Sequence, residues 1–391
     1  MGRVKTARPA AALLLSIALL LAGGCSSDLL DWAKNTAGKL GTVGTYSNGS
    51  KTIACYWKGA TKIDLPGDSG DFNPGHSCQC NSAVMVNDTL YILQGNRWDG
   101  SKMVGCYWTV TGGNAAVADL PGGAGWTSSY NMGTYATQET LSQGLFYASG
   151  YWSDGINNTP CYWKIEGTSV TRTDLSPPVA TSHSSVAGHV WLEDNIVYSS
   201  GWYWNGTSSV PCYWVNSAAP TPLPVPNVQV FDWDCQLYGF WKVGSTLYIT
   251  GSYNINHNNP SVACFWTVTG SSISRTDLGD GSHDSAAWWS DLSTGTPYTD
   301  GRRSDGTKWI PCYWVGTQRY DLPGDSMDLT PGRNADTGGF IHAGDVLYVS
   351  GDYYDGSKQV ACYWTIQGST ITRTDRTGAG YDTGDGGFFL Y

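Results

Sequence analysis

Residues able to bind a ligand gather in segments of this 391-residue chain that differ from one another. They combine carboxylates and imidazoles with aromatic rings and one arginine. Rings can stack on the apolar face of a sugar, while carboxylates accept hydrogen bonds from its hydroxyl groups. Each residue taken singly also fits an ordinary polar turn. The candidate ligand-binding rim consists of Asp68, Asp71, His76, Trp126, His183, Asp232, Trp233, Asp234, His283, Asp284 and Arg333.

The segments between these candidates are copies of one repeat. A Cys-Tyr-Trp or Cys-Phe-Trp motif recurs about every fifty residues, among short β-branched and aromatic runs bounded by turn residues. Such a unit cannot bury its hydrophobic face alone and must stack on its neighbours. Four strands in each of seven copies predict an all-β, seven-bladed β-propeller with four antiparallel strands per blade. The repeated cysteines are Cys55, Cys106, Cys161, Cys212, Cys264, Cys312 and Cys362.

An Asp-Gly or Asn-Gly pair separates the second and third strands of six copies. Such pairs favour the type I′ turn of a two-residue hairpin. In an up-and-down blade these hairpins share one face of the ring with the connections between blades, and the candidate rim falls in those connections. The pairs begin at Asn48, Asp99, Asp154, Asn205, Asp305 and Asp355.

The two ends of the repeat region predict how the ring closes. The first copy begins near Leu40, already at its second strand, and so lacks an innermost strand. Residues 385–390 repeat the pattern of residues 337–341, the innermost strand of the last copy. We therefore expect the C-terminal segment to complete blade 1, which also covers an open sheet edge.

The N-terminus resembles a bacterial lipoprotein signal. Arg3, Lys5 and Arg8 precede an apolar run over residues 10–22, and Cys25 follows two glycines. The resemblance implies a signal peptide over residues 1–24, a palmitate-bearing Cys25 with a tether over residues 25–39, and a propeller over residues 40–391. It places the protein on the bacterial cell envelope, at the outer membrane or cell surface, held to the membrane by its lipid. A secretory signal cleaved elsewhere is the alternative, whereas the run is too short for a membrane span.

Net charge narrows the range of partners. Removal of residues 1–24 leaves 19 basic against 32 acidic residues, a formal charge of −13. Such a surface repels a phosphate backbone, so we expect no nucleic-acid partner. The expected state is a monomer.

Several residues invite a disulfide or a metal. Equivalent cysteines on neighbouring blades are separated by the sheet spacing of about 10 Å, beyond disulfide reach, so the repeated cysteines should be buried thiols. Pairing or metal binding among Cys78, Cys80 and Cys235 stays open. The Gly67–Asp71 segment, echoed by Gly324–Asp328, suits calcium or a plain turn. No other cofactor is expected, and His76, His183 and His283 lie on alternate blades, too far apart to share zinc.

A further repeated aspartate follows six of the seven motifs, as in Asp119-Leu120-Pro121, and only the fourth copy lacks it. An aspartate before such a turn commonly bonds the turn backbone. Its repetition argues for an architectural role, and nothing singles out a pair of carboxylates for acid–base chemistry.

The Tyr-Trp pair, the Asp-Gly hairpin and the closing Asp-Leu resemble bacterial extracellular Tyr-Trp-type propeller repeats and, more distantly, kelch repeats. The resemblance implies blades and leaves the activity open. The sequence predicts a lipid-anchored, exported binding module for glycan or protein at the loop-bearing face. The alternatives are a propeller hydrolase or lyase acting on polysaccharide, or a purely structural envelope lipoprotein.

Overall fold

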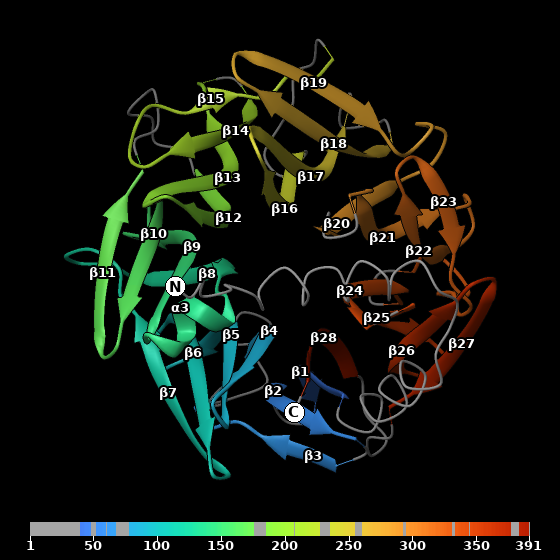
Figure 1. Ribbon diagram of the computed structural model, residues 1–391, viewed down its shortest axis with the longest axis horizontal. Coiled ribbons are helices and arrows are strands. Elements are labelled where there is room, and N and C mark those ends of the chain that lie inside the picture. The colour runs from blue at the N-terminus through green and yellow to red at the C-terminus, as the bar shows by residue number, and fades with distance from the viewer. Residues whose placement is uncertain are drawn as a thin grey trace, which may run out of the picture.

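The computed structural model describes residues 40–47, 52–59, 61–67, 78–175, 185–206, 208–226, 235–254, 260–291, 295–330, 333–343, 345–376 and 383–390. These residues form seven antiparallel sheets of four strands each, arranged as blades around a central axis (Figure 1). The fold is therefore the predicted seven-bladed β-propeller.

Each blade is described from its innermost strand to its outermost strand. Blade 1 contains β28 (Thr383–Leu390), β1 (Leu40–Ser47), β2 (Thr52–Lys58) and β3 (Thr61–Asp64). Blade 2 contains β4 (Gln79–Val86), β5 (Thr89–Trp98), β6 (Met103–Thr111) and β7 (Asn114–Leu120). Blade 3 contains β8 (Ser128–Tyr135), β9 (Leu145–Ser153), β10 (Asn158–Glu166) and β11 (Ser169–Asp174). Blade 4 contains β12 (Val186–Glu193), β13 (Ile196–Trp204), β14 (Ser209–Val215) and β15 (Thr221–Pro222).

Blade 5 contains β16 (Cys235–Val243), β17 (Thr246–Asn254), β18 (Ser261–Thr269) and β19 (Ser272–Asp277). Blade 6 contains β20 (Ser285–Asp291), β21 (Tyr298–Ser304), β22 (Trp309–Val315) and β23 (Gln318–Asp321). Blade 7 contains β24 (Asp336–Ala343), β25 (Val346–Tyr354), β26 (Gln359–Gln367) and β27 (Thr370–Asp375). One short helix, α3 (Gln138–Ser142), joins β8 to β9 and is capped by Thr137. No helix among the described residues is long and apolar enough to cross a membrane.

The C-terminal strand closes the ring as predicted. β28 pairs antiparallel with β1, so that Leu390 lies opposite Leu40 and Thr383 opposite Tyr46. Figure 1 shows this pairing as a dark red strand beside a blue one. Blade 1 is thus built from both ends of the propeller.

The ring has two faces, which differ in the turns they carry. The face with the turns between second and third strands and the connections between blades is called the hairpin face below. The opposite face carries the turns between first and second strands and those between third and fourth strands. Because the innermost strand of a blade starts at the hairpin face, its first residues surround that mouth of the central channel.

The repeated motif holds neighbouring blades together. The seven motif tryptophans and cysteines are buried. The indole N–H of Trp163 in blade 3 donates to the carbonyl of Pro121 after blade 2 at 2.9 Å, and Trp364 bonds Pro323 at 2.8 Å in the same way. These two tryptophans therefore fill the gap between two sheets and satisfy the turn of the preceding blade.

The ten cysteines that the structure describes are buried thiols, as predicted for the repeated ones. Cys78, Cys80 and Cys235 are among them, and the Cys80 thiol donates to the Gly44 carbonyl at 3.1 Å. No cluster of three or more potential metal-ligating side chains occurs within the described ranges.

The type I′ prediction is wrong for the five described pairs, and the pair at Asn48 lies outside the described residues. The Asp99 carboxylate accepts hydrogen bonds from the backbone N–H groups of Ser101 and Lys102 at 2.8 and 2.9 Å. Only the glycine has a positive φ, +101° at Gly100. The aspartate's side chain thus organises a four-residue loop from within. Two-residue turns with positive φ at both positions instead join first to second strands, as at Asn87 and Asp88, with φ of 47° and 61°.

The aspartate that follows six of the motifs also differs from expectation. It pairs with side chains and not with the turn backbone, as in the two-bond pairing of Arg97 with Asp119 and of Arg303 with Asp321. The leucine that follows it is buried, and its N–H bonds the residue before the motif cysteine, as Leu175 does with Pro160 at 2.8 Å. The element anchors the outermost strand.

Candidate functional site: the central channel at the hairpin face

Four of the candidate rim residues lie within the described part of the chain, on three different connections: Trp126, His283, Asp284 and Arg333. The others lie outside the described residues, as does Cys25. They are Asp68, Asp71, His76, His183, Asp232, Trp233 and Asp234.

The first three described rim residues pack their connections against neighbouring hairpins. The Lys102 ammonium lies 3.5 Å from the centre of the Trp126 ring. The His283 ring lies against Gly306, where an added Cβ would come within 2.8 Å of it. Asp284 accepts hydrogen bonds from the N–H and hydroxyl groups of Ser261 at 2.7 and 3.1 Å.

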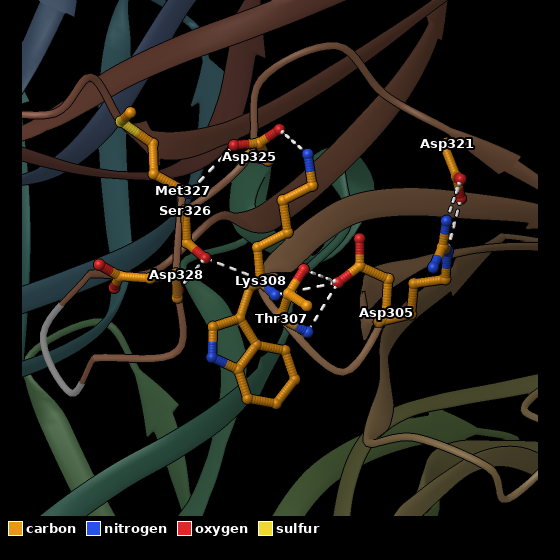
Figure 2. A network of polar contacts seen from close by, with 10 residues as sticks. Asp305, Thr307, Lys308, Asp321, Asp325, Ser326, Met327 and Asp328 are labelled. Atoms are coloured by element: carbon orange, nitrogen blue, oxygen red, sulfur yellow. Dashed lines mark hydrogen bonds and ion pairs between the residues drawn. The ribbon is translucent and has the colours of Figure 1, made fainter.

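Arg333 belongs to a larger polar network at the connection after blade 6. It pairs with Asp328 at 2.5 Å, and its guanidinium lies 5.0 Å from the centre of the Tyr354 ring. Figure 2 shows the other half of this network, in which Asp325 pairs with Lys308 at 2.6 Å. Ser326 accepts from the Trp309 N–H at 2.7 Å, which fixes the connection to the hairpin. Both carboxylates of the Gly324–Asp328 segment thus have protein cations as partners, whereas Asp68 and Asp71 lie outside the described residues.

None of these four residues lines the cavities that described residues form in the channel. Their contacts hold connections to hairpin tips, and a ligand role for any of the rim residues stays a prediction. A cavity lined by described residues lies further in, on the channel axis.

The channel contains a cavity of about 300 Å³. Its wall over blades 2 and 3 consists of amides, and its wall over blades 5 to 7 contains two aromatic rings and the start of β24. An adjoining chamber of about 180 Å³ shares Met132 and Tyr238 with it and is lined mainly by apolar groups of blades 3 to 5. The first cavity is lined by Gln79, Asn81, Gln94, Asn96, Asn131, Met132, Tyr238, Trp288, Thr337 and Gly338.

The amide wall depends on one extra residue in blade 2. In blade 3 one residue, Ser149, separates the residue opposite the motif tryptophan from the glycine opposite the motif cysteine. Blade 2 has two residues there, Leu93 and Gln94, and the pairing shifts between Ile92 and Gly95. This β-bulge puts Gln94 at φ +54°, a left-handed conformation that glutamine rarely adopts. Bulges of this kind redirect side chains and are frequent beside functional sites.

Hydrogen bonds fix the orientation of the amides. The Gln94 Nε2 group donates to the Met132 carbonyl at 2.7 Å. The Asn96 side chain accepts from the Asn131 N–H at 2.8 Å and donates to the Asn131 carbonyl at 3.1 Å. These bonds join blade 2 to the innermost strand of blade 3.

Two acceptors on this wall have no protein partner. Gln94 is 9% exposed and Asn131 is 2% exposed. Gln94 Oε1 and Asn131 Oδ1 are buried and accept no hydrogen bond from the protein. Buried acceptors are costly unless a ligand or an ordered water donates to them. Gln94 Oε1 and Asn131 Oδ1 are therefore unsatisfied acceptors in two residues that line the cavity.

Two rings line the facing wall, and an ion pair lies near them outside the cavity lining. Tyr238 and Trp288 pack edge to face with centroids 4.4 Å apart. Arg302 in β21 pairs with Asp336 at 2.7 Å, with side chains 23% and 25% exposed. The Arg302 guanidinium also lies 4.3 Å from the centre of the Trp309 ring. The pair links blade 6 to the first residue of the innermost strand of blade 7.

A second carboxyl group stands beside this ion pair. Asp352 in β25 lies directly opposite Asp336 in the strand pairing and accepts from Gln359 Nε2 at 2.7 Å. Burial, and then repulsion by Asp336, raise the pKa of Asp352 to about 8. Burial also raises the pKa of Asp336, against the opposing effect of Arg302. Neither carboxyl group is among the residues that line the channel cavity.

Our sequence reasoning missed the channel residues because it examined the connections and not the strands. The sequence did contain a signal, because the second strand of blade 2 has one residue more before its central glycine than the same strand of blade 3. The position after the central glycine of the second strand also varies, as Asn96, Tyr151, Trp202, Ser252, Arg302 and Asp352.

Comparisons with known proteins agree with the fold. No protein-family model matches the sequence, and no characterised protein matches it in sequence either. Similar solved structures include a hypothetical selenium-binding protein from Sulfolobus tokodaii, 10% identical, with a TM-score of 0.53, covering 90% of this chain and 93% of that chain. The chain is thus a β-propeller protein.

Two other similar structures are more distant. An ulvan lyase of a new polysaccharide lyase family is 10% identical, with a TM-score of 0.49, covering 77% of this chain and 86% of that chain. A six-bladed fungal lectin from Aleuria aurantia that recognises fucose is 13% identical, with a TM-score of 0.40, covering 76% and 96%. At these identities the likeness concerns the fold alone.

Proposed function

We propose that this propeller is a binding module that takes a hydroxyl-rich ligand, a glycan, at the hairpin-face mouth of its channel. The observation that carries the proposal is the bulge that presents Gln94 to the cavity in one blade of seven. Sugar hydroxyls supply the donors that Gln94 Oε1 and Asn131 Oδ1 accept. The rings of Tyr238 and Trp288 offer surfaces for the C–H groups of the sugar.

The binding test uses a broad glycan array and the soluble protein, residues 26–391. We expect specific glycan binding that is lost in a register variant, in which Leu93 is deleted and Gln94→Ser gives blade 2 the strand length of its neighbours. Gln318→Met, which removes an exposed amide from β23, is the matched control and should bind as wild type does. Absence of binding to every glycan would overturn the proposal.

The rim residues enter the same experiment as a second arm. If the connections also contact the glycan, Trp233→Ala with Asp234→Ala will weaken binding without changing which glycans bind. Loss of binding in EDTA would bring in a metal such as calcium.

The carboxyl pair at Asp336 and Asp352 is the feature that a polysaccharide-cleaving enzyme would need. Arg302 and Gln359 hold these two groups within the protein. We therefore favour binding over hydrolase or lyase activity, and we expect glycans that bind to be recovered uncleaved.

We also propose that the protein is exported and anchored to the cell envelope through lipid on Cys25. The proposal rests on the residues before the propeller, where basic residues, an apolar run and a cysteine follow in order. Labelling with an alkyne analogue of palmitate should mark the wild-type protein and not Cys25→Ser. Equal labelling of both would contradict it.

A further inference from the structure

A second cavity lies on the opposite face of the ring, between blades 6 and 7. Its volume is about 440 Å³. Asp345 in the turn between β24 and β25 and Gly368 in the turn between β26 and β27 border it. Leu347 and Ile366 provide apolar floor. The channel cavity has no lining residue in common with it.

An aromatic residue that the other blades lack forms one wall. Tyr320 in β23 lies opposite the motif residue Tyr313. It stacks on Tyr313 with centroids 5.0 Å apart and planes at 16°. Tyr320 is 43% exposed, so its outer surface is presented to the groove. The equivalent positions in the other blades hold smaller or aliphatic residues: Ile63, Ala118, Thr173, Thr221, Thr276 and Thr374.

The groove also contains a histidine, at a strand position where blades 4 and 5 carry other residues. His342 lies opposite Leu347 in blade 7, where blade 5 has Lys242 and blade 4 has Leu192. Its Nδ1 lies 3.2 Å from the Asp291 carboxylate, and Tyr298 packs edge to face against its ring at 4.6 Å. The imidazole is thereby held in one orientation between two blades.

These features fit one class of ligand. An exposed tyrosine face above an apolar floor suits the C–H face of a pyranose ring. A buttressed imidazole and the exposed Asp345 carboxylate suit the hydroxyl groups along its edge. An open groove of this size, in which aromatic rings and apolar groups lie beside polar groups, has the character of a ligand site.

We propose that this groove, lined by Tyr298, Tyr313, Tyr320 and His342, is a second binding site, which holds a sugar ring of a neutral polysaccharide. Because it lies on the face away from the hairpins, the propeller can engage polysaccharide on both sides of the ring. The proposal rests on its own residues and does not require the channel site.

The test uses soluble protein and four neutral probes: cellohexaose, laminarihexaose, xylohexaose and chitohexaose. Binding is measured by ligand-observed saturation-transfer NMR and calorimetry. Every measurement is made on wild type and on a protein that carries Gln94→Met, because this substitution removes the channel amide. We expect at least one hexasaccharide to bind in that background.

Tyr320→Thr then decides the location, since threonine is the residue that several blades carry there. In the Gln94→Met background it should weaken binding about tenfold. His342→Leu, the residue of blade 4, should also weaken it. Gln318→Thr, two residues away and outside the groove, is the matched control and should leave the affinity unchanged.

Two results would overturn this site. One is that no hexasaccharide binds the Gln94→Met protein. The other is that Tyr320→Thr binds as tightly as its parent. If binding to wild type is lost with Gln94→Met alone, the second site fails while the proposed channel function stands.

Discussion

Gln94 has a strained backbone conformation and lines the candidate ligand site. Its backbone occupies the left-handed region, which costs a non-glycine residue roughly 1–3 kcal/mol. Such a conformation persists because the register of β5 with β6 imposes it on either side. The gain is that the Gln94 side chain lines the channel cavity and bonds the innermost strand of blade 3.

The strain predicts a trade between stability and binding. Gln94→Gly relieves the strained φ but loses the bond to the Met132 carbonyl, so its free energy of unfolding should stay within about 1 kcal/mol of wild type. Gln94→Val should be less stable than Gln94→Gly by about 2 kcal/mol, since a β-branched residue tolerates positive φ poorly. Denaturant unfolding measures both. Equal stability of the two variants would show that residue 94 is not strained.

Asp352 gives the stability of the protein a defined pH dependence. Its pKa is about 8 in the folded protein and about 3.9 in an unfolded chain. Between these values the folded protein holds a proton that the unfolded chain releases. The contribution is full below about pH 4 and is lost as the pH rises through about 8, by at most about 1.4 kcal/mol per pH unit.

Asp352→Asn should remove this contribution. The variant should be more stable than wild type at pH 8.5 and close to it near pH 4.5, as measured by denaturant unfolding across that range. A stability difference that does not change with pH would contradict the assigned protonation.

At the residue scale, sequence reasoning could identify which side chains repeat but not which unrepeated ones converge. The candidate rim was chosen because it varies, and its described members lie on three separate connections. Gln94 and Asn131 are 37 positions apart and meet only because blade 2 packs on blade 3. Spatial convergence of this kind depends on register and on blade rotation, which the local sequence does not state.

At the scale of elements, the motif tryptophan is the joint between blades. Trp163→Phe removes the hydrogen bond to the Pro121 carbonyl and leaves a void between blades 2 and 3. We expect it to lower the free energy of unfolding by about 2–4 kcal/mol. Trp152→Phe is the control, because that half-buried ring bonds Asp174 near the surface and should cost about 1 kcal/mol or less. An equal decrease in the free energy of unfolding in both variants would contradict the role of the motif tryptophan in joining the blades.

The turns show why composition alone misjudges an element. An Asp-Gly pair fits a type I′ turn, yet Asp99 keeps a negative φ because its carboxylate can cap two N–H groups of a longer loop. The hydrogen bonds that the Asp99 side chain accepts therefore favour the four-residue loop over the type I′ turn. Strand existence was predicted well, because the period of two and the repeat reinforce each other.

At the scale of the whole molecule, closure of the ring depends on β28. A chain that ends at Asp382 loses the innermost strand of blade 1 and exposes the edge of β1. We expect a markedly lower Tm and a less cooperative transition in calorimetry. A synthetic peptide of residues 383–391 should partly restore the Tm. An unchanged Tm in the truncated chain would contradict closure by this strand.

The ring was predictable because seven imperfect copies leave few other architectures for their hydrophobic faces. The lining of the channel was not predictable in the same way. It depends on places where one copy of the repeat has an extra residue or a different side chain. The same deviations, at Gln94 in the channel and at Tyr320 on the opposite face, carry both proposals.

The most direct test of the central claim is a crystal structure of the propeller with a glycan that binds it on the array. We predict a sugar in the channel cavity, with a hydroxyl within hydrogen-bond distance of Gln94 Oε1 or Asn131 Oδ1 and a ring against Trp288 or Tyr238. A glycan bound only to the connections, with the channel occupied by water, would contradict the claim.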